Sequence, residues 1–375
     1  MVNKKSLLLI AILLSLLALT PGCIDMDFYT SSDHKDKNII TYGASPTKIS
    51  YYISYGCRIQ LNGTGEYNIR YNLNLPETLK GSYKPIVYFN ENYENKTVST
   101  FNQIKSWNIS GYDSNKYTLG LEAYIESETF MVSDLRGTDA LTLTQIKKQK
   151  PEILEQYCHS QTHDNISYIN PDLPEIKNIS NSIKNESKTD NSFQLAKQLF
   201  IWLKTNTKYQ PHNTSFSVQT SYETLKKKTG DCDDLSFLYI SLCRSIGIPA
   251  RFISGFSVEQ IDNNTSATGH AWVEIYVGNQ LGYNGWIPVE CAGKSNDIQA
   301  QIQQNFGVET ARHLRLYKDD GSNHSLNFFL TNLRVRYDKR LEVTENSFQE
   351  IEEYQIIERK KLYVDNEEGC RTLQL

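Results

Sequence analysis

Apolar and polar residues alternate over residues 48–76 of the chain. Tyr51, Ile53 and Tyr55 fall on one face of an extended segment. After the turn-like Asn62-Gly63-Thr64-Gly65, a second alternating set follows: Tyr67, Ile69, Tyr71, Leu73 and Leu75. A period of two is typical of strands that are buried on one face. Because further tyrosine-rich segments run from 85 to 131, we expect a β-sandwich-like domain whose aromatic residues form core and cross-strand pairs.

The spacing becomes helical beyond this region. Residues 142–155 predict a helix, and the polar segment 159–192 predicts a linker with irregular structure. A buried helix is predicted next, with its apolar stripe at Phe193, Ala196, Phe200 and Leu203. Thr220 and Glu223 have the spacing of a capping box, which predicts the start of another helix that runs to Gly230.

A further helix is predicted directly after Cys232. Its apolar positions are 235, 238, 239, 242, 243 and 246, widened by Phe237 and Ile240, so most of its circumference should be buried. Asp231 can cap the first turn, which places Cys232 where unpaired N–H groups and the helix dipole favour a thiolate. Asp233 and Asp234 disfavour a further negative charge on the sulfur. A thiolate therefore needs a cationic neighbour.

The segment 270–290 supplies a candidate for that neighbour. Its alternation predicts two strands joined by a Gly/Asn-rich turn. If the hairpin is centred near Gln280, Glu290 lies opposite His270 on the same face. An acid beside a histidine fixes its tautomer and stabilises the imidazolium that forms when a thiol loses its proton. We therefore predict a nucleophile, a base and an orienting acid at Cys232, His270 and Glu290.

Other interpretations of these residues carry less weight. A single cysteine is by default a packing residue or half of a disulfide, but three positions in this order favour catalysis. Asp231, Asp233 and Asp234 could bind a cation, yet capping explains them without one, and no metal is expected. Trp272 and Trp286 follow the same alternation as His270, which suits either a wall of the cleft or support of the core.

Several motifs from Phe193 to Glu290 resemble the core of the transglutaminase-like superfamily, which is related in layout to papain-like cysteine proteases. They are Gly230-Asp231-Cys232, the helix end Arg244-Ser245-Ile246-Gly247-Ile248-Pro249-Ala250-Arg251, Ser254-Gly255-Phe256, His270-Ala271-Trp272-Val273-Glu274 and Gly285-Trp286-Ile287-Pro288-Val289-Glu290. The resemblance implies an α+β fold in which a helix-borne cysteine packs on an antiparallel sheet. It assigns the nucleophile to Cys232, the base to His270 and the acid to Glu290. The family usually has Asp at the last position, and Glu is one methylene longer.

These patterns divide the chain into six expected regions. They are a signal peptide over 1–23, a tether over 24–47, a β-rich domain over 48–135, a helix and linker over 136–192, a transglutaminase-like catalytic domain over 193–340 and a C-terminal extension over 341–375. Strands after residue 304 could complete the catalytic sheet, and the charged tail FQEIEEYQIIERKK suits a surface helix or a strand pair.

The N-terminus predicts export. Lys4 and Lys5 precede an apolar run from Leu7 to Leu19, which is shorter than the roughly 20 residues of a spanning helix. Thr20-Pro21-Gly22-Cys23 resembles the lipobox of prokaryotic lipoproteins, so Cys23 is the expected lipidation site. Simple cleavage or an uncleaved anchor are the alternatives. The expected location is the extracytoplasmic face of the membrane, or outside the cell.

Composition excludes some classes of partner. The 375 residues carry a net charge of −4 with both signs scattered, so a nucleic-acid partner is not expected. The seven cysteines lack a C-x-x-C spacing, and an exported protein could pair some of them in disulfides that spacing does not identify.

The most economical functional prediction is a membrane-anchored cysteine hydrolase without a cofactor. Cys232 would attack an amide carbonyl of a protein or peptide substrate and form a thioester acyl-enzyme. Water as acceptor gives a peptidase or amidase, and a lysine amine gives a transglutaminase. The third possibility is a non-catalytic cell-surface binding protein that retains the fold.

Overall fold

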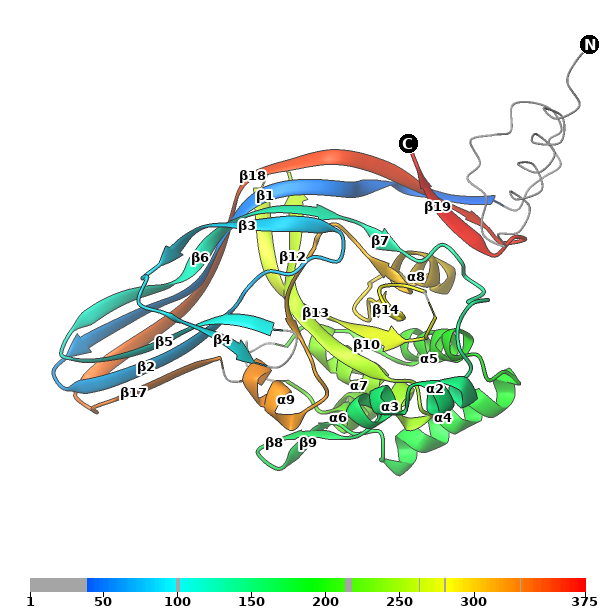
Figure 1. The fold of residues 1–375 in the computed structure, drawn as a ribbon, viewed down its shortest axis with the longest axis horizontal. Helices are drawn as coiled ribbons and strands as arrows, with labels where there is room; N and C mark the ends of the chain where they lie inside the picture. The colour runs from blue at the N-terminus through cyan, green and yellow to red at the C-terminus, as the bar shows by residue number, and fades with distance from the viewer. Residues whose placement is uncertain (1–38, 99–101, 213–217, 263, 280, 331) are drawn as a thin grey trace, which may run out of the picture.

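The computed structural model describes residues 39–98, 102–212, 218–262, 264–279, 281–330 and 332–375. The described residues form a β-rich lobe and a mixed lobe in which helices surround an antiparallel sheet (Figure 1). The α+β class predicted from the sequence is confirmed.

Two antiparallel sheets build the β-rich lobe. One sheet contains, in spatial order, β19 (Cys370–Gln374), β18 (Leu341–Asp365), β1 (Ile39–Gly63), β6 (Asn115–Glu128) and β3 (Gly81–Phe89). The other contains β17 (Leu333–Tyr337), β2 (Glu66–Asn74), β5 (Asn102–Tyr112) and β4 (Glu94–Val98). Tyr51, Ile53 and Tyr55 on β1 are buried, and so are Tyr67 and Ile69 on β2, as their alternation predicts.

Both ends of the described chain contribute to this lobe, which differs from the expected division. The strand β1 begins at Ile39, inside the segment 24–47 that we expected to be a tether. The expected extension 341–375 forms β18 and β19, and β18 pairs with β1 from Gly63↔Leu341 to Ile39↔Asp365. The reason is that β1 and β18 pair over a long distance in the sequence. A charged strand with one exposed side has a weak local sequence pattern, so its strand structure is hard to predict. The remaining domain boundaries stay predictions.

The mixed lobe is centred on a four-stranded antiparallel sheet. Its order is β14 (Trp286–Val289), β13 (Asn264–Tyr276), β12 (Ala250–Ile261) and β16 (His313–Lys318). The helices around it are α2 (Leu143–Gln149), α3 (Pro151–Tyr157), α4 (Pro174–Ser187), α5 (Ser192–Asn206), α6 (Ser221–Lys227), α7 (Cys232–Ser245), α8 (Ile298–Asn305) and α9 (Asn323–Leu330). The short strands are β7 (Phe130–Met131), β8 (Gln161–His163), β9 (Ile166–Ile169), β10 (Lys208–Tyr209), β11 (Thr229–Gly230) and β15 (Val308–Glu309).

The helix α7 is the centre of this lobe. Every residue from Asp234 to Arg244 is buried, as its nearly continuous apolar circumference predicts. The helix packs against α4, α5 and α6 and against the strands β12 and β13. It ends before Gly247, whose φ of 88° suits a glycine after a helix. This packing fixes the position of Cys232 at the first residue of α7.

The polar segment 159–192 is more ordered than predicted. It contains the hairpin of β8 and β9 and all of α4 instead of an irregular linker. Ile176 is fully buried, and Ile179 and Ile183 pack partly against the same core. Three isoleucines at helical spacing are enough to dock a helix whose remaining residues are polar. The irregular linker was predicted from the polar composition of the segment, and the three-isoleucine pattern was not taken into account.

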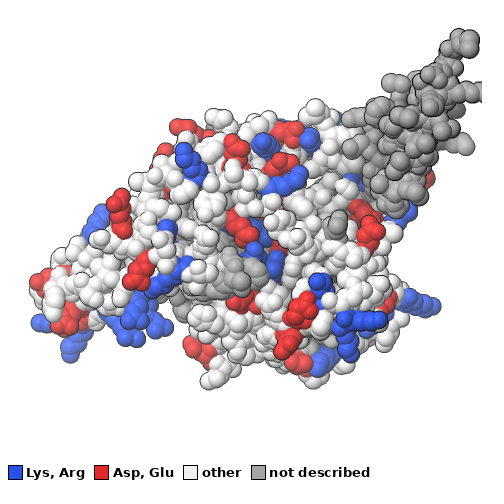
Figure 2. Space-filling view, in the orientation of Figure 1, with Lys and Arg blue, Asp and Glu red and all other residues white. Residues whose placement is uncertain are grey.

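The N-terminal predictions lie outside the described residues. The expected signal peptide, the lipidation site Cys23 and the first part of the expected tether all precede residue 39. Within the described part of the chain, every helix is too short or too polar to cross a membrane. On the face shown in Figure 2, acidic and basic side chains lie next to one another, as the scattered charges of the sequence predict.

Candidate active site

The nucleophile candidate stands at the start of the central helix. Cys232 is half-buried and is separated from β11 by Asp231 alone. The strand β11 pairs in parallel with β10, so that Tyr209 lies beside Gly230. A Cβ on Gly230 would lie 2.5 Å from the Cβ of Asp234. Gly230 therefore lets the Asp234 side chain fold back over the start of α7. The backbone N–H of Cys232 is in the first helical turn, where it has no intrahelical acceptor.

Asp234 does not oppose a thiolate in the way that the sequence suggests. Its buried carboxylate accepts hydrogen bonds from the backbone N–H of Gln219 at 2.6 Å, from Gln219 Nε2 at 2.6 Å and from the Asp231 N–H at 3.1 Å. His212 Nε2 lies 2.7 Å from the same group. The predicted cap by the Asp231 side chain makes no hydrogen bond, and the contact at this helix start runs from the Asp231 N–H to Asp234 instead. Asp234 thereby joins α7 to the chain before α6.

Asp233 holds a proton instead of a charge at neutral pH. Burial raises the pKa of this carboxyl to about 9, and a hydrogen bond with Asp231 and the charges of Asp231 and Asp234 act in the same direction. The two acids beside the sulfur are thus a partnered carboxyl, Asp234, and a protonated one, Asp233. The negative charge near Cys232 is smaller than a count of the acids gives.

His270 and Glu290 lie together, although the hairpin register differs from the prediction. The strands β13 and β14 pair Val273 with Val289 and Glu274 with Pro288. The residue numbers of each pair sum to 562, whereas a hairpin centred on Gln280 would give 560. Glu290 follows the last residue of β14. A shift of two residues keeps the facing side unchanged, and Glu290 Oε2 lies 2.6 Å from His270 Nε2.

The carboxylate of Glu290 is fully engaged. Its Oε1 accepts the backbone N–H of Ala292 at 2.6 Å, and its Oε2 lies 2.6 Å from His270 Nε2 and 3.2 Å from His313 Nε2. Burial alone would raise the pKa of Glu290, but the charges and hydrogen bonds of His270 and His313 hold it well below its usual value. Glu290 is therefore an anion in a fixed orientation.

The histidine and the cysteine are electrostatically linked. Burial lowers the pKa of His270, yet the charge of Glu290 and hydrogen bonds with Cys232 and Glu290 outweigh it and raise the pKa to about 10. Burial raises the pKa of the Cys232 thiol, His270 lowers it, and Asp233 and Asp231 raise it. Burial thus opposes the thiolate that we expected at rest, and no pattern in the sequence indicated that burial. The imidazolium of His270 supplies the predicted cation.

Sequence reasoning missed His313 and Tyr209. His313 begins β16, is 8% exposed, and has no spacing signal that separates it from the other residues of a strand. Burial raises the pKa of Tyr209 to about 12, with the charges of Cys232, Asp231 and Glu290 adding to it, so its hydroxyl remains a hydrogen-bond donor. Tyr209, His270, Glu290 and His313 line one cavity of about 540 Å³.

A buried ionic network supports this cavity from the core side. Glu274 on β13 pairs with Arg251 at 2.6 Å and with Arg315 at 2.7 Å. Arg315 also pairs with Glu309, which accepts a hydrogen bond from Trp272 Nε1 at 2.8 Å. Trp272 is 1% exposed, so it supports the core beneath the histidines.

Three groups of side chains at or near Cys232 have metal-binding geometry. Ligand atoms lie within 4.8 Å of one another in His270, Glu290 and His313, in His212, Asp231 and Asp234, and in Asp231, Cys232 and Asp233. The first two groups are also joined by the hydrogen bonds described above, and in the third Asp231 and Asp233 are hydrogen-bonded to each other. Those hydrogen bonds account for the arrangement without a metal ion.

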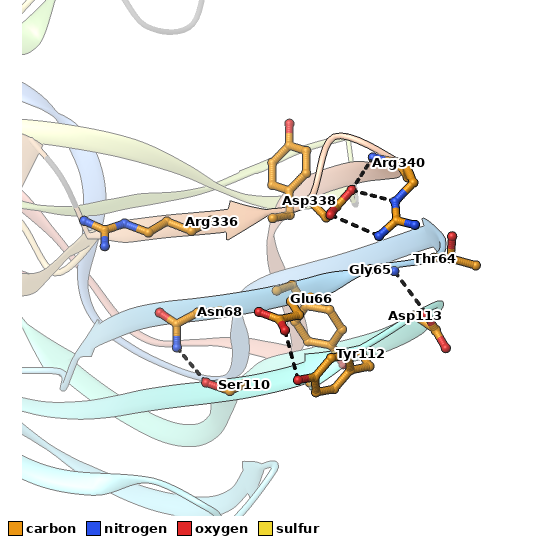
Figure 3. Close-up of a pocket in the computed structure, with 13 residues that line it drawn as sticks. Thr64, Gly65, Glu66, Asn68, Ser110, Tyr112, Asp113, Arg336, Asp338 and Arg340 are labelled. Atoms are coloured by element: carbon orange, nitrogen blue, oxygen red, sulfur yellow. Dashed lines mark hydrogen bonds and ion pairs between the residues drawn. The ribbon is translucent and has the colours of Figure 1, made fainter.

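Another pocket lies at the far end of the β-rich lobe (Figure 3). It encloses about 970 Å³ and is built from the ends of β2, β5 and β17 and the adjoining turns. Several of its polar groups are paired with one another, since Tyr112 donates to Glu66 and Arg340 pairs with Asp338. The candidate catalytic residues are not among those that line it.

Part of the chain is similar to known proteins. Residues 177–291 match the model of the transglutaminase-like superfamily. YebA of Bacillus subtilis (strain 168) is 25% identical over 48% of this chain and 29% of its own length. ML0607 of Mycobacterium leprae (strain TN) is 28% identical over 24% of this chain and 33% of its own. The chain thus spans about a third of the length of these curated relatives.

Two solved structures overlap more of the chain at lower identity. A proposed cysteine protease from Cytophaga hutchinsonii is 13% identical, with a TM-score of 0.47 over 85% of this chain and 93% of that one. The periplasmic domain of TgpA from Pseudomonas aeruginosa is 12% identical, with a TM-score of 0.32 over 64% of this chain and 88% of that one.

Proposed function

Because residues 177–291 belong to the transglutaminase-like superfamily, we propose that the protein is a cysteine hydrolase that cleaves amide bonds in proteins or peptides. The observation that carries the proposal is the chain of contacts from the half-buried Cys232 at the start of α7 through His270 to Glu290. A thiol, an imidazole and an oriented carboxylate are the groups that acyl transfer to a cysteine requires.

In the proposed reaction His270 is already an imidazolium, because its pKa is raised to about 10, and the Cys232 thiol beside it releases its proton to solvent. The thiolate attacks the carbonyl carbon, His270 gives its proton to the leaving amine, and a thioester remains on Cys232. Water then attacks the thioester with His270 as base. The free N–H of Cys232 at the start of α7 would bind the developing oxyanion. Glu290 keeps the imidazole in the orientation that both proton transfers need.

The acceptor and the cellular location are the finer parts of the proposal. We favour water as acceptor, and a primary amine would make the same acyl-enzyme a transglutaminase. Export and lipid attachment at Cys23 rest on the sequence of residues 1–23. The mass of the mature N-terminus would test that part directly.

The test is alkylation of the purified full chain by iodoacetamide between pH 5 and 10, followed by intact mass and peptide mapping. We expect Cys232 to react in the wild type and His270→Ala to slow it about tenfold at pH 8, because loss of the cation raises the thiol pKa further. Cys158→Ala is the matched control, since Cys158 is also half-buried but lies at the end of α3. It should leave the rate unchanged.

The acyl-enzyme is then sought with peptide amides and activated esters. A mass increase on Cys232 that decays in water supports the hydrolase, and transfer of that mass to an added primary amine supports the transglutaminase. Alkylation of Cys232 that does not depend on His270 would contradict both enzymes and favour the binding protein.

A further inference from the structure

His313 contacts the proposed catalytic groups without belonging to the predicted triad. Its Nε2 lies 3.2 Å from Glu290 Oε2, the same oxygen that lies 2.6 Å from His270 Nε2. The rings of His313 and His270 are parallel within 4° and their centroids are 5.2 Å apart. Two imidazoles therefore share one carboxylate oxygen in a largely buried site.

The surroundings of His313 restrain its ring and favour one tautomer. It stacks on Trp272 at a centroid distance of 4.7 Å, and Trp272 is itself held by the hydrogen bond to Glu309. Thr310 Oγ1 lies 3.5 Å from His313 Nδ1, so its hydroxyl can donate to that nitrogen and leave the proton of the ring on Nε2. In this tautomer, His313 is a donor to Glu290.

Glu290 has a particular need for such a donor. A glutamate side chain has one more rotatable bond than an aspartate, and an unrestrained carboxylate would lose its alignment with His270. The backbone N–H of Ala292 restrains Oε1 at 2.6 Å. The only contact in the described residues that restrains Oε2 besides His270 itself is the one with His313.

We propose that His313 is a positioning residue, which donates its Nε2–H to Glu290 and thereby holds the carboxylate against His270 Nε2. The effect of His313 on catalysis rests on the proposed hydrolase function. The hydrogen bond from His313 to Glu290 does not depend on that function. The active group would then be four residues, with Cys232, His270 and Glu290 completed by His313 from the strand β16. His313 acts through Glu290 and does not touch the reacting atoms.

Other charged groups near His313 belong to the same cavity. They are His270 on β13, Glu290 after β14, Glu259 on β12, Lys294 before α8 and Arg312 beside His313 itself. A change in any of them would also alter the titration of the site, so the test must vary His313 alone.

The test separates the N–H donor of His313 from its ring. His313→Gln keeps an N–H group at the place of Nε2 and loses the ring. His313→Phe keeps a ring to stack on Trp272 and loses the donor. His324→Phe, at an exposed histidine of α9, is the control for a change of histidine content. All variants are made in the full chain and checked by thermal unfolding, and His313→Met replaces His313→Phe if the latter does not fold.

Two measurements are made on each variant. The first is the pKa of His270 from an NMR titration of its imidazole, and the second is the alkylation rate of Cys232 at pH 8. In His313→Phe we expect the pKa of His270 to fall by about one pH unit and alkylation to slow about tenfold. In His313→Gln we expect both values to stay close to the wild type.

The outcomes distinguish this inference from the proposed function. Equal losses in His313→Gln and His313→Phe would show that the ring and not the donor matters, which overturns the inference. An unchanged or higher pKa of His270 in His313→Phe would do the same. If wild-type Cys232 does not react in a His270-dependent way, the hydrolase proposal fails, while the titration of His270 still decides the role of His313.

Discussion

The acids beside Cys232 show how little a residue's type fixes its charge in a folded protein. Asp233 and Asp234 are adjacent, yet Asp234 accepts donors from Gln219 and Asp231 whereas the pKa of Asp233 is raised to about 9. A protonated carboxyl can sit near a thiolate at little cost. The sequence DCDD therefore does not exclude an activated cysteine.

Replacing Asp233 by Asn should make stability less dependent on pH. The pKa of this carboxyl is near 4 in the unfolded chain and about 9 in the folded protein. Between these two pH values the free energy of unfolding therefore falls as pH rises, by at most about 1.4 kcal/mol per pH unit. Asn mimics the protonated form and removes this loss. We expect Asp233→Asn to have the wild-type free energy of unfolding near pH 4 and a larger one at pH 8.

Urea unfolding at several pH values measures this difference. Asp139→Asn, at an exposed aspartate before α2, is the control and should run parallel to the wild type. A gap between Asp233→Asn and the wild type that does not widen with pH would show that Asp233 is ionised in the folded protein.

At the scale of elements, the site depends on the close approach of β12 and β16. Gly255 on β12 pairs with His270 of β13 on one side and with Arg315 of β16 on the other, next to a register shift. A Cβ on Gly255 would lie 1.9 Å from the backbone oxygen of Leu314. Only glycine lets these strands approach in this way, which gives a physical reason for the Ser254-Gly255-Phe256 motif.

Gly255→Ala should therefore push β16 away from β12 and separate His313 from Glu290. We expect the free energy of unfolding to fall by about 2 kcal/mol, and alkylation of Cys232 at pH 8 to slow as in His313→Phe. Gly269→Ala is the matched control, because a Cβ on Gly269 on the neighbouring strand β13 meets no atom within 4 Å. Similar stability of the two variants would contradict the argument.

The elements also show what the sequence could and could not predict. The helices α6 and α7 were predictable, because the Thr220 and Glu223 capping box and the apolar periodicity after Cys232 are local signals. So was the meeting of His270 with Glu290, since a hairpin needs only the right parity. His313 was not, because β16 reaches the site through a pairing with β12 that spans some sixty residues and leaves no local pattern.

For the whole molecule, the two ends of the described chain are joined to each other and to the mixed lobe. The strand β18 pairs with β1, β19 pairs with β18, and Arg371 on β19 is 1% exposed. Its guanidinium donates to the backbone oxygens of Val132, Ile302, Gln303, Phe306 and Gly307. The last four lie in or after α8, so a residue near the C-terminus fastens the end of α8 to the β-rich lobe.

Arg371→Met should consequently destabilise both lobes together. Burial lowers the pKa of Arg371 to about 9, so a charge in this place is costly. Its removal takes a donor from five carbonyl oxygens, of which, within the described part of the chain, only those of Ile302 and Gly307 keep a backbone N–H donor. We expect the loss of hydrogen bonds to dominate and the free energy of unfolding to fall by about 3 kcal/mol at pH 7. Hydrogen exchange should rise in α8 as well as in β19, because the contact joins them. Arg340→Met, at an exposed arginine after β17, is the control and should change neither measurement. Faster exchange confined to β19, with unchanged protection of α8, would show that the C-terminal strand is only an addition to the sheet and not a fastening of the lobe that carries the site.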